Sequence, residues 1–94
     1  MNKAQLVDLA ATKTEMTKKQ LDEALTVFTS CITEVVAGKD KVTLVGFGSF
    51  EARDRKAREG RNPKTGDKME IPATVVPAFS AGKQFKDAVA RVRQ

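Results

Sequence analysis

Apolar residues recur at helical spacing at the start of the chain. Leu6 and Leu9 fall on one face of a helix, and Asn2 with Gln5 three residues later forms a variant of the capping box. The pattern predicts a short first helix that ends near Lys13.

A longer second helix is predicted from Lys18 to about Ala37. It opens with another capping box, Thr17 with Gln20, and Gly38 is placed to be its C-terminal cap. Its apolar stripe comprises Leu21, Ala24, Leu25, Phe28, Cys31, Ile32, Val35 and Val36. The first helix is too short to cover this stripe, so we take it as one wall of a core shared by two chains.

The middle of the chain alternates between apolar and polar residues, as half-buried strands do. Val42 with Leu44 predicts one strand, and Phe50 with Ala52 predicts a second strand after a glycine-containing turn. The segment 72–77 begins and ends with proline, which indicates an edge strand because proline cannot donate to a central ladder.

Ser80 is placed to cap a last short helix, at about residues 81–92. The chain is then a single α+β domain: a helical hairpin, a short antiparallel sheet extended into a β-ribbon arm, and a C-terminal helix. We expect the helical part to span about 1–40 and the sheet with its arm about 41–80, the arm itself being residues 53–71.

The arm lacks any core-forming pattern and is strongly basic. Its 19 residues hold seven Lys or Arg against four Asp or Glu, a net charge of +3, and the whole chain has a net charge of +5. Pro63 suits the first central position of a turn, Asn62 the position before it and Gly66 the exit. The sequence therefore predicts two polar strands joined at a turn, mobile until a long anion lies against them.

This composition favours nucleic acid as the partner. Lysine and arginine attract phosphate without sequence preference, a strand pair is thin enough to enter a DNA groove, and Pro63 is an apolar wedge that can insert between base steps. The plainer alternative is a solvated surface hairpin, which needs neither so many cations nor a proline at its tip. A membrane surface would instead require a basic amphipathic helix with Trp or Phe.

Residues that carry most enzyme chemistry are scarce. There is no histidine and a single cysteine, and no two carboxylates look placed as an acid–base pair. We predict a protein that is not an enzyme, with no metal and no cofactor.

Cys31 and the five phenylalanines fall at core-facing positions, which disfavours stacking of bases on aromatic rings. Without a bilayer-spanning run or a signal-peptide pattern, we expect an intracellular protein.

Several runs of residues resemble the bacterial histone-like HU family, whose sister is integration host factor. The matching runs are Gly46–Glu51, Gly60–Gly66, Ile71–Ala73, Pro77–Phe79, Ala81–Lys83 and Lys86–Val89. The resemblance covers essentially all 94 residues. It implies an intertwined dimer, expected to be a homodimer, whose two arms lie in the minor groove of double-stranded DNA and bend and compact it with little sequence specificity. It also implies a cytoplasmic, nucleoid-associated protein that prefers bent, nicked or otherwise deformable DNA.

The resemblance also implies roles for single positions in the arm. Pro63 would be the intercalating wedge, flanked by Asn62, with Thr65 in the same turn, and Met69 and Ile71 would face the groove. Phosphates and groove walls would be contacted by Arg53, Arg55, Lys56, Arg58, Arg61 and Lys64.

Further positions are implied outside the arm. Gly46 and Ser49 would lie where the sheet meets the DNA, and Lys3, Lys83 and Lys86 would extend the contact along the flanks of a bent duplex. The family pattern leads us to expect lysine at positions 75 and 80. This chain has Val75 and Ser80 there instead, so we expect some of the flank contacts to be weaker. Three alternatives stay open: a sequence-specific DNA-bending subunit similar to integration host factor, an RNA-binding protein, and a module whose arm docks an acidic protein surface.

Overall fold

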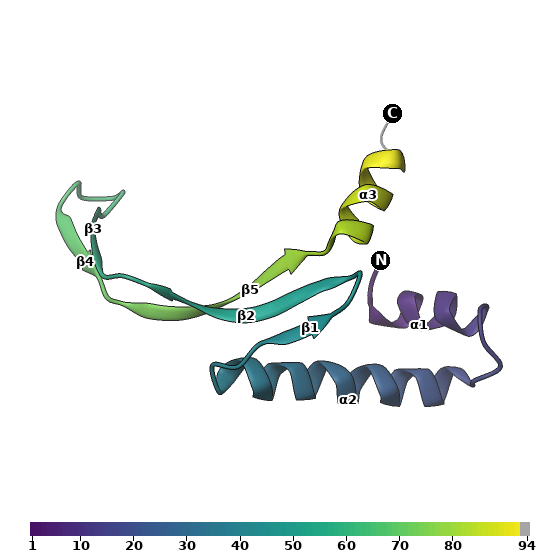
Figure 1. Ribbon diagram of the computed structural model, residues 1–94. Helices are drawn as coiled ribbons and strands as arrows, with labels where there is room; N and C mark the ends of the chain where they lie inside the picture. The colour runs from purple at the N-terminus through teal and green to yellow at the C-terminus, as the bar shows by residue number, and fades with distance from the viewer. Residues whose placement is uncertain (93–94) are drawn as a thin grey trace. The chain divides into compact units, whose positions relative to one another are not determined.

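The computed structural model describes residues 1–92 and confirms the α+β class. Its elements, drawn in Figure 1, are α1 (Lys3–Ala11), α2 (Lys18–Ala37), β1 (Val42–Leu44), β2 (Gly48–Arg55), β3 (Arg58–Arg61), β4 (Lys68–Ile71), β5 (Thr74–Ala81) and α3 (Lys83–Val92). The chain divides into two compact units, residues 1–34 and the residues from 35 onwards, with the boundary inside α2.

Both predicted capping boxes are present at the starts of α1 and α2. The Asn2 side chain accepts a hydrogen bond from the Gln5 N–H at 2.9 Å, and the Gln5 side chain accepts one from the Asn2 N–H at 2.9 Å. Thr17 and Gln20 make the same reciprocal pair at 3.1 and 2.9 Å. Such a cap stabilises a helix by about 1 kcal/mol, which explains why both helices begin where the sequence predicts.

Gly38 directly follows the last residue of α2, at the predicted cap position, and the left-handed residue comes one position later. Lys39 carries the positive φ of 65°, and Gly38 does not. The Lys39 N–H donates to the Val36 carbonyl at 2.9 Å, and the Asp40 N–H donates to the Val35 carbonyl at 3.1 Å. These two bonds are those of a Schellman motif with Lys39 in the position that usually holds glycine.

An antiparallel sheet in the order β1-β2-β5 forms the base of the second unit. β5 lies at its edge, paired with β2 along eight residues, and Pro77 lies opposite Ala52 within that pairing. The predicted edge strand is confirmed, because Pro77 has no N–H to offer and needs no second neighbour.

Four phenylalanines pack together on one face of this sheet. Phe50 lies directly opposite Phe79, and their ring centres are 4.9 Å apart. Phe47 from the β1–β2 turn stacks on Phe85 of α3, with ring centres 5.1 Å apart. These rings tie the turn, the sheet and α3 into one cluster, as core positions should.

The predicted start of α3 at Ser80 is wrong. Ser80 lies in β5 opposite Ser49, and the helix begins at Lys83. Gly82 precedes it, donating its N–H to the Phe47 carbonyl at 2.7 Å and accepting the Lys86 N–H at 3.0 Å. The strand runs on past Ser80 because Ser80 and Ala81 still have partners in β2.

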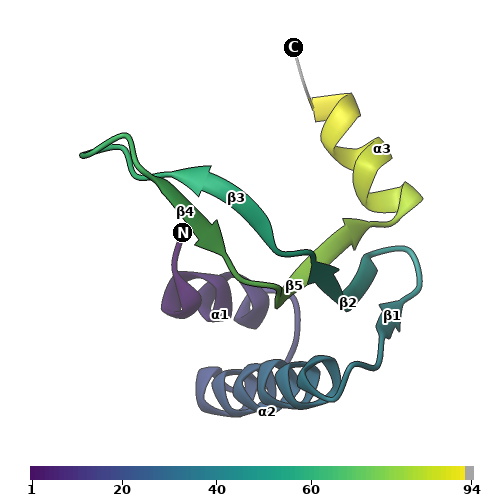
Figure 2. The same ribbon diagram turned by 90° about the vertical axis from the view of Figure 1, so that its left-hand side faces the viewer.

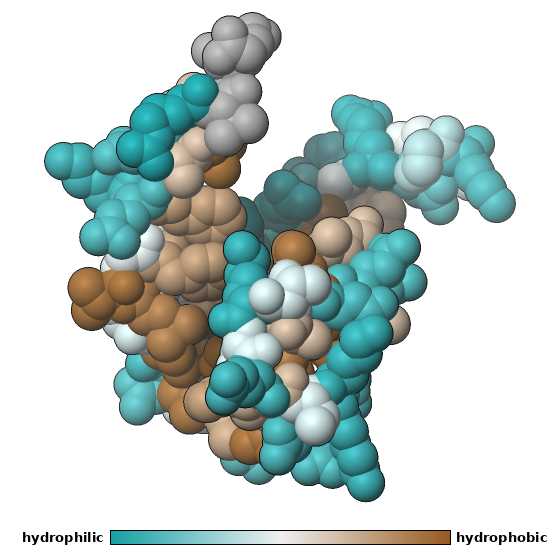
Figure 3. Space-filling view, turned by 90° about the vertical axis from the view of Figure 1, so that its right-hand side faces the viewer, coloured by the Kyte–Doolittle hydropathy of each residue, from teal (hydrophilic) through white to brown (hydrophobic). Residues whose placement is uncertain are grey.

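Much apolar surface remains uncovered in the single chain, as the brown areas of Figure 3 show. Only Val7 and Val36 are buried among the apolar residues of the described part. Phe28, which is 67% exposed, and Cys31 are not covered in the single chain, so their place in a core shared by two chains stays a prediction. Both lie on the side of α2 that also leaves Val27 exposed, so the stripe is wider than one chain covers. No helix within residues 1–92 is both long enough and apolar enough to cross a membrane.

Candidate nucleic-acid interface

The strands of the arm continue those of the sheet (Figures 1 and 2). β2 pairs with β5 as far as Arg55 opposite Thr74, and pairing resumes with Arg58 opposite Ile71. Two residues are skipped on each strand, so the register is the same on both sides of the break. One of the four, Pro72, lacks the N–H that a ladder needs, which accounts for the loss of pairing. We call the part beyond the break, residues 58–71, the arm hairpin.

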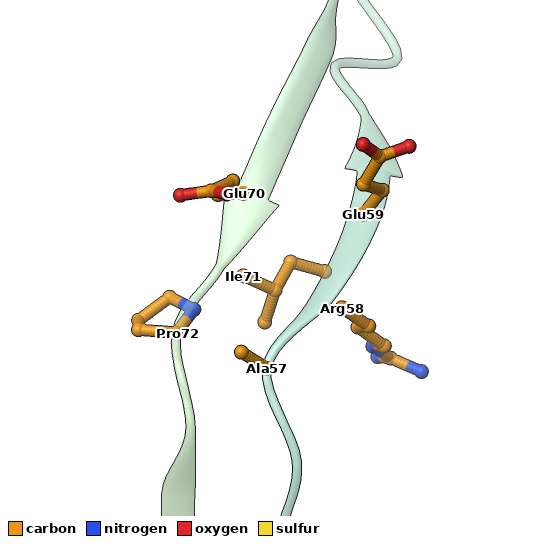
Figure 4. Close-up of a pocket in the computed structure, with 6 residues that line it drawn as sticks. All are labelled: Ala57, Arg58, Glu59, Glu70, Ile71 and Pro72. Carbon is orange, nitrogen blue, oxygen red and sulfur yellow. The ribbon is translucent and has the colours of Figure 1, made fainter.

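The break leaves a hollow between the two strands. It is lined by Ala57, Arg58, Glu59, Glu70, Ile71 and Pro72, shown in Figure 4. The Ile71 side chain lies across this hollow toward Gly60, where an added Cβ would be 2.9 Å from Ile71 Cδ1. Gly60 therefore leaves room for Ile71, which gives the polar hairpin an apolar contact between its strands.

The tip of the arm hairpin forms the predicted turn. The Asn62 N–H donates to the Asp67 carbonyl at 2.8 Å, and the Gly66 N–H donates to the Asn62 carbonyl at 2.7 Å. Asn62 Oδ1 accepts the Lys64 N–H at 2.9 Å, and Gly66 has a φ of 76° that favours glycine. Pro63 is exposed on this hydrogen-bonded turn, as a wedge must be.

Two further predicted site residues brace the turn. Thr65 Oγ1 accepts the Asp67 N–H at 3.3 Å. Arg61 Nη1 donates to the Gly66 carbonyl at 3.2 Å, so its guanidinium reaches forward to the tip. In the free chain both side chains hold the shape of the turn that presents Pro63.

The arm hairpin has two chemically different faces. Directly opposite residues share a face, and successive residues alternate between faces. Arg58 with Ile71 and Gly60 with Met69 therefore form one face, which we call the apolar face. The other, the acidic-pair face, consists of Glu59, Glu70, Arg61 and Lys68. The predicted contacts Arg58 and Arg61 thus lie on opposite faces of the hairpin.

Arg53, placed in the arm by its sequence, belongs to β2 and is already engaged. Its Nε donates to Glu51 Oε1 at 3.2 Å, and its Nη2 donates to Ser80 Oγ at 3.0 Å. Lys41 Nζ lies 3.9 Å from the other oxygen of Glu51. On the same face the hydroxyl of Ser49 lies 3.2 Å from that of Thr43. These side chains form a polar network on this face of the sheet. A phosphate that binds Arg53 would have to compete with Glu51 and Ser80 for its guanidinium.

The other cations of the predicted site are exposed and, among the residues that the structure describes, carry no ion pair. Within residues 1–92, none of the following forms an ion pair, and all are exposed: Arg55, Lys56, Arg58, Arg61, Lys64, Lys83 and Lys86. Lys3 differs, because its ammonium lies 3.4 Å from Asp22 Oδ1 and also donates to the Thr26 hydroxyl. Lys3 belongs to the first compact unit, and the arm belongs to the second. In the described part no three His, Cys, Asp or Glu side chains cluster as metal ligands would.

Gly46 holds the turn before β2 against α3. Its φ is 86°, and a Cβ there would lie 2.6 Å from the Gln84 side-chain oxygen. The backbone conformation therefore favours glycine, whereas the flexible Gln84 side chain could move aside. Gly46 therefore has a structural role in the free chain, in addition to its predicted position near DNA.

Sequence reasoning missed three residues of this surface. Lys68 lies opposite Arg61 and adds a cation to the arm hairpin. Counting back from the turn would have paired these two, since a hairpin fixes its own register. Glu51 was missed as a partner of Arg53, although residues two apart in a strand share a face. Ser80 was missed because its contact with Arg53 runs diagonally over the sheet, which no sequence pattern marks.

Comparisons with known proteins agree on one family. The family model described as bacterial DNA-binding protein matches residues 1–90. A DNA-binding protein HU from a Nostoc species is 67% identical over 90 residues, covering 96% of each chain. A solved structure of Anabaena HU with DNA matches with a TM-score of 0.91 and 67% identity, covering 96% of this chain and 98% of that one. HU from Thermotoga maritima matches with a TM-score of 0.68 at 35% identity, covering 95% and 98%.

These matches extend over the helices, the sheet and the arm alike, and the identity far exceeds what a shared fold alone requires. The resemblance drawn from the sequence is confirmed, and the chain belongs to the HU group of the bacterial DNA-binding protein family.

Proposed function

We propose that this chain is a non-enzymatic architectural protein that binds, bends and compacts double-stranded DNA with little sequence specificity. The observation that carries the proposal is the arm hairpin: a two-stranded ribbon with exposed cations and an exposed proline on a hydrogen-bonded turn. The relative whose structure was solved with DNA supports duplex DNA as the ligand.

Each arm enters the minor groove and Pro63 inserts between base steps at its tip. An inserted apolar side chain partly unstacks a step and kinks the duplex. Affinity comes mainly from counterion release by lysine and arginine, which carries no sequence information. The proposed contacts are Lys3, Gly46, Ser49, Arg53, Arg55, Lys56, Arg58, Arg61, Asn62, Pro63, Lys64, Thr65, Met69, Ile71, Lys83 and Lys86.

The functional unit we propose is a homodimer with two arms. Val27 is 57% exposed and Phe28 67% exposed on α2, and Leu44 and Phe79 are also exposed in the single chain. Apolar area of this extent on a chain of 94 residues favours a second copy that covers it. Two arms on one dimer hold a duplex at two places, which a bend requires.

Low specificity follows from the chemistry of the proposed contacts. Phosphate contacts position a protein without reading bases, so preference arises from how easily a DNA site deforms. We accordingly place the protein in the cytoplasm, associated with the nucleoid, where it meets DNA of every sequence.

A gel-shift comparison at fixed salt tests the proposal. Linear, nicked and four-way-junction DNA of equal length are titrated with the chain, and matched RNA duplex serves as competitor. We expect the nicked and junction forms to bind more tightly than linear duplex, because they are already easy to bend. Equal affinity for all three DNAs would contradict bending, and preferential loss of the complex to RNA would contradict duplex DNA as the ligand.

A further inference from the structure

Two glutamates oppose each other across the arm hairpin. Glu59 of β3 is the direct partner of Glu70 of β4, and both are exposed. Within residues 1–92 neither forms an ion pair with a lysine or arginine. Like charges directly opposite destabilise a strand pair, and a short two-stranded ribbon is marginal in water. The pair therefore weakens the hairpin of the free chain.

The opposite face of the same hairpin carries different chemistry. Met69 is 46% exposed beside Gly60, and Ile71 lies across the hollow between the strands. Figure 4 shows the carboxylate ends of Glu59 and Glu70 pointing away from Ile71. The hairpin thus has an apolar face without acids and a second face where two acids offset the charges of Arg61 and Lys68.

We infer that the Glu59–Glu70 pair selects the face of the arm hairpin that lies against DNA. This inference deepens the proposed function and rests on it. A polyanion repels the paired carboxylates, so the acidic-pair face turns outward and the apolar face meets the groove. Arg61 lies on the outward face and meets DNA only at the tip, where its guanidinium reaches the Gly66 carbonyl. The two glutamates are positioning residues, since they act by exclusion and contact no part of the DNA.

Thiol protection reports which face is covered. The native thiol is removed by Cys31→Ser, and one new thiol is introduced either by Met69→Cys on the apolar face or by Lys68→Cys on the acidic-pair face. The rate of alkylation by iodoacetamide is measured with and without saturating linear duplex, and fluorescence anisotropy confirms saturation for each variant. We expect DNA to slow alkylation several-fold at position 69 and little at position 68.

The role of the pair is tested by neutralising it. Adding Glu59→Gln and Glu70→Gln to both probe variants should raise protection at position 68 and shrink the difference between the positions. The matched control, Glu15→Gln with Glu23→Gln, removes the same two charges from exposed positions outside the arm and should leave the difference unchanged. A negative charge about 10 Å from a phosphate repels it in water by an energy that corresponds to roughly a twofold change in affinity. Removing glutamate charges therefore does not weaken binding, and both double variants remain bound.

The outcomes separate this inference from the proposed function. Equal protection at both positions, or stronger protection at position 68, overturns the orientation. A difference that survives Glu59→Gln with Glu70→Gln overturns the role of the pair, as does a difference that the control double variant also abolishes. Anisotropy that shows binding without protection at either position overturns the inference and leaves DNA binding standing. Anisotropy that shows no binding by the Cys31→Ser chain overturns both.

Discussion

Arg53 and Ser80 are joined across β2 and β5 by a hydrogen bond of 3.0 Å, although Arg53 lies opposite Val76 in the ladder. The arginine side chain runs diagonally over the sheet to reach the serine, and Glu51 accepts a second bond from it on the way. A lysine at position 80 would repel this guanidinium. Ser80, whose lack of charge was expected to weaken DNA contacts, is thus the residue that lets Arg53 lie along the sheet.

Glu51→Gln should increase DNA affinity. The substitution frees Arg53 and Lys41 from a competing carboxylate. An exposed ion pair contributes up to about 1 kcal/mol, so the gain in affinity should be up to roughly fivefold. Fluorescence anisotropy at low salt measures it. Ser80→Ala is the control: it removes a neutral hydrogen bond and leaves Glu51 in place, so it should change affinity less. Unchanged affinity in Glu51→Gln would show that the carboxylate does not compete with phosphate.

Pro63→Ala should reduce bending while leaving most of the binding to straight duplex. Alanine keeps the turn backbone near Asn62 and Lys64 but removes the ring that unstacks a base step. End-to-end energy transfer on a doubly labelled duplex measures the bend angle, and anisotropy measures affinity. Pro77→Ala, in the body of β5, is the matched control and should leave the bend unchanged. The wedge role fails if both variants bend DNA as the parent does.

Lys39→Gly should stabilise the fold. Lys39 occupies the left-handed region, which costs a residue with a side chain about 1–2 kcal/mol, and the added chain entropy of glycine offsets roughly 0.5–1 kcal/mol of the gain. Urea denaturation measures the difference in the free energy of unfolding. The companion variant Gly38→Ala should be tolerated, because Gly38 has no positive φ. A large loss of stability in Gly38→Ala would place the left-handed residue at 38 instead.

Gly48→Ala should destabilise the sheet by roughly 1–3 kcal/mol, as overpacking does. An added Cβ would lie 2.6 Å from the Phe79 ring and from the Ser80 carbonyl oxygen. Thermal unfolding measures the loss. Combining it with Phe79→Leu, which removes the ring edge, should give a total cost smaller than the sum of the two single variants. Strict additivity would show that crowding against Phe79 is not the cause.

The apparent unfolding temperature should rise with protein concentration. A chain that folds with a partner gains stability by mass action, whereas a monomer does not. Scanning calorimetry over a hundredfold concentration range gives the slope, and sedimentation at micromolar concentration gives the mass. A stable monomer with a concentration-independent transition would contradict the homodimer inferred from Phe28 and its exposed neighbours.

Features fixed by neighbouring residues were predictable from the sequence. Asn2 with Gln5 and Thr17 with Gln20 act within one helical turn, and the turn around Pro63 depends on its own side chains. These short-range bonds leave the chain few alternatives. The cations of the arm also needed no tertiary information, because strands without a core side remain exposed.

Features that depend on distant contacts were not predictable. Ser80 resembles a helix cap, but its strand continues because β2 still offers partners. Glycine usually takes the left-handed position at a helix end, but here Lys39 takes it instead of Gly38, because the bonds from Lys39 and Asp40 decide which residue turns left-handed.

The equal gap on both strands at the base of the arm hairpin limits how its length can change. β2 with β5 and β3 with β4 keep one register across the two skipped residues on each side. Because side chains alternate with a period of two, an insertion of one residue per strand would exchange the two faces at the tip, and an insertion in one strand alone would shift the register. Longer or shorter arms that present Met69 and Ile71 on the same side are therefore expected to differ in steps of two residues per strand.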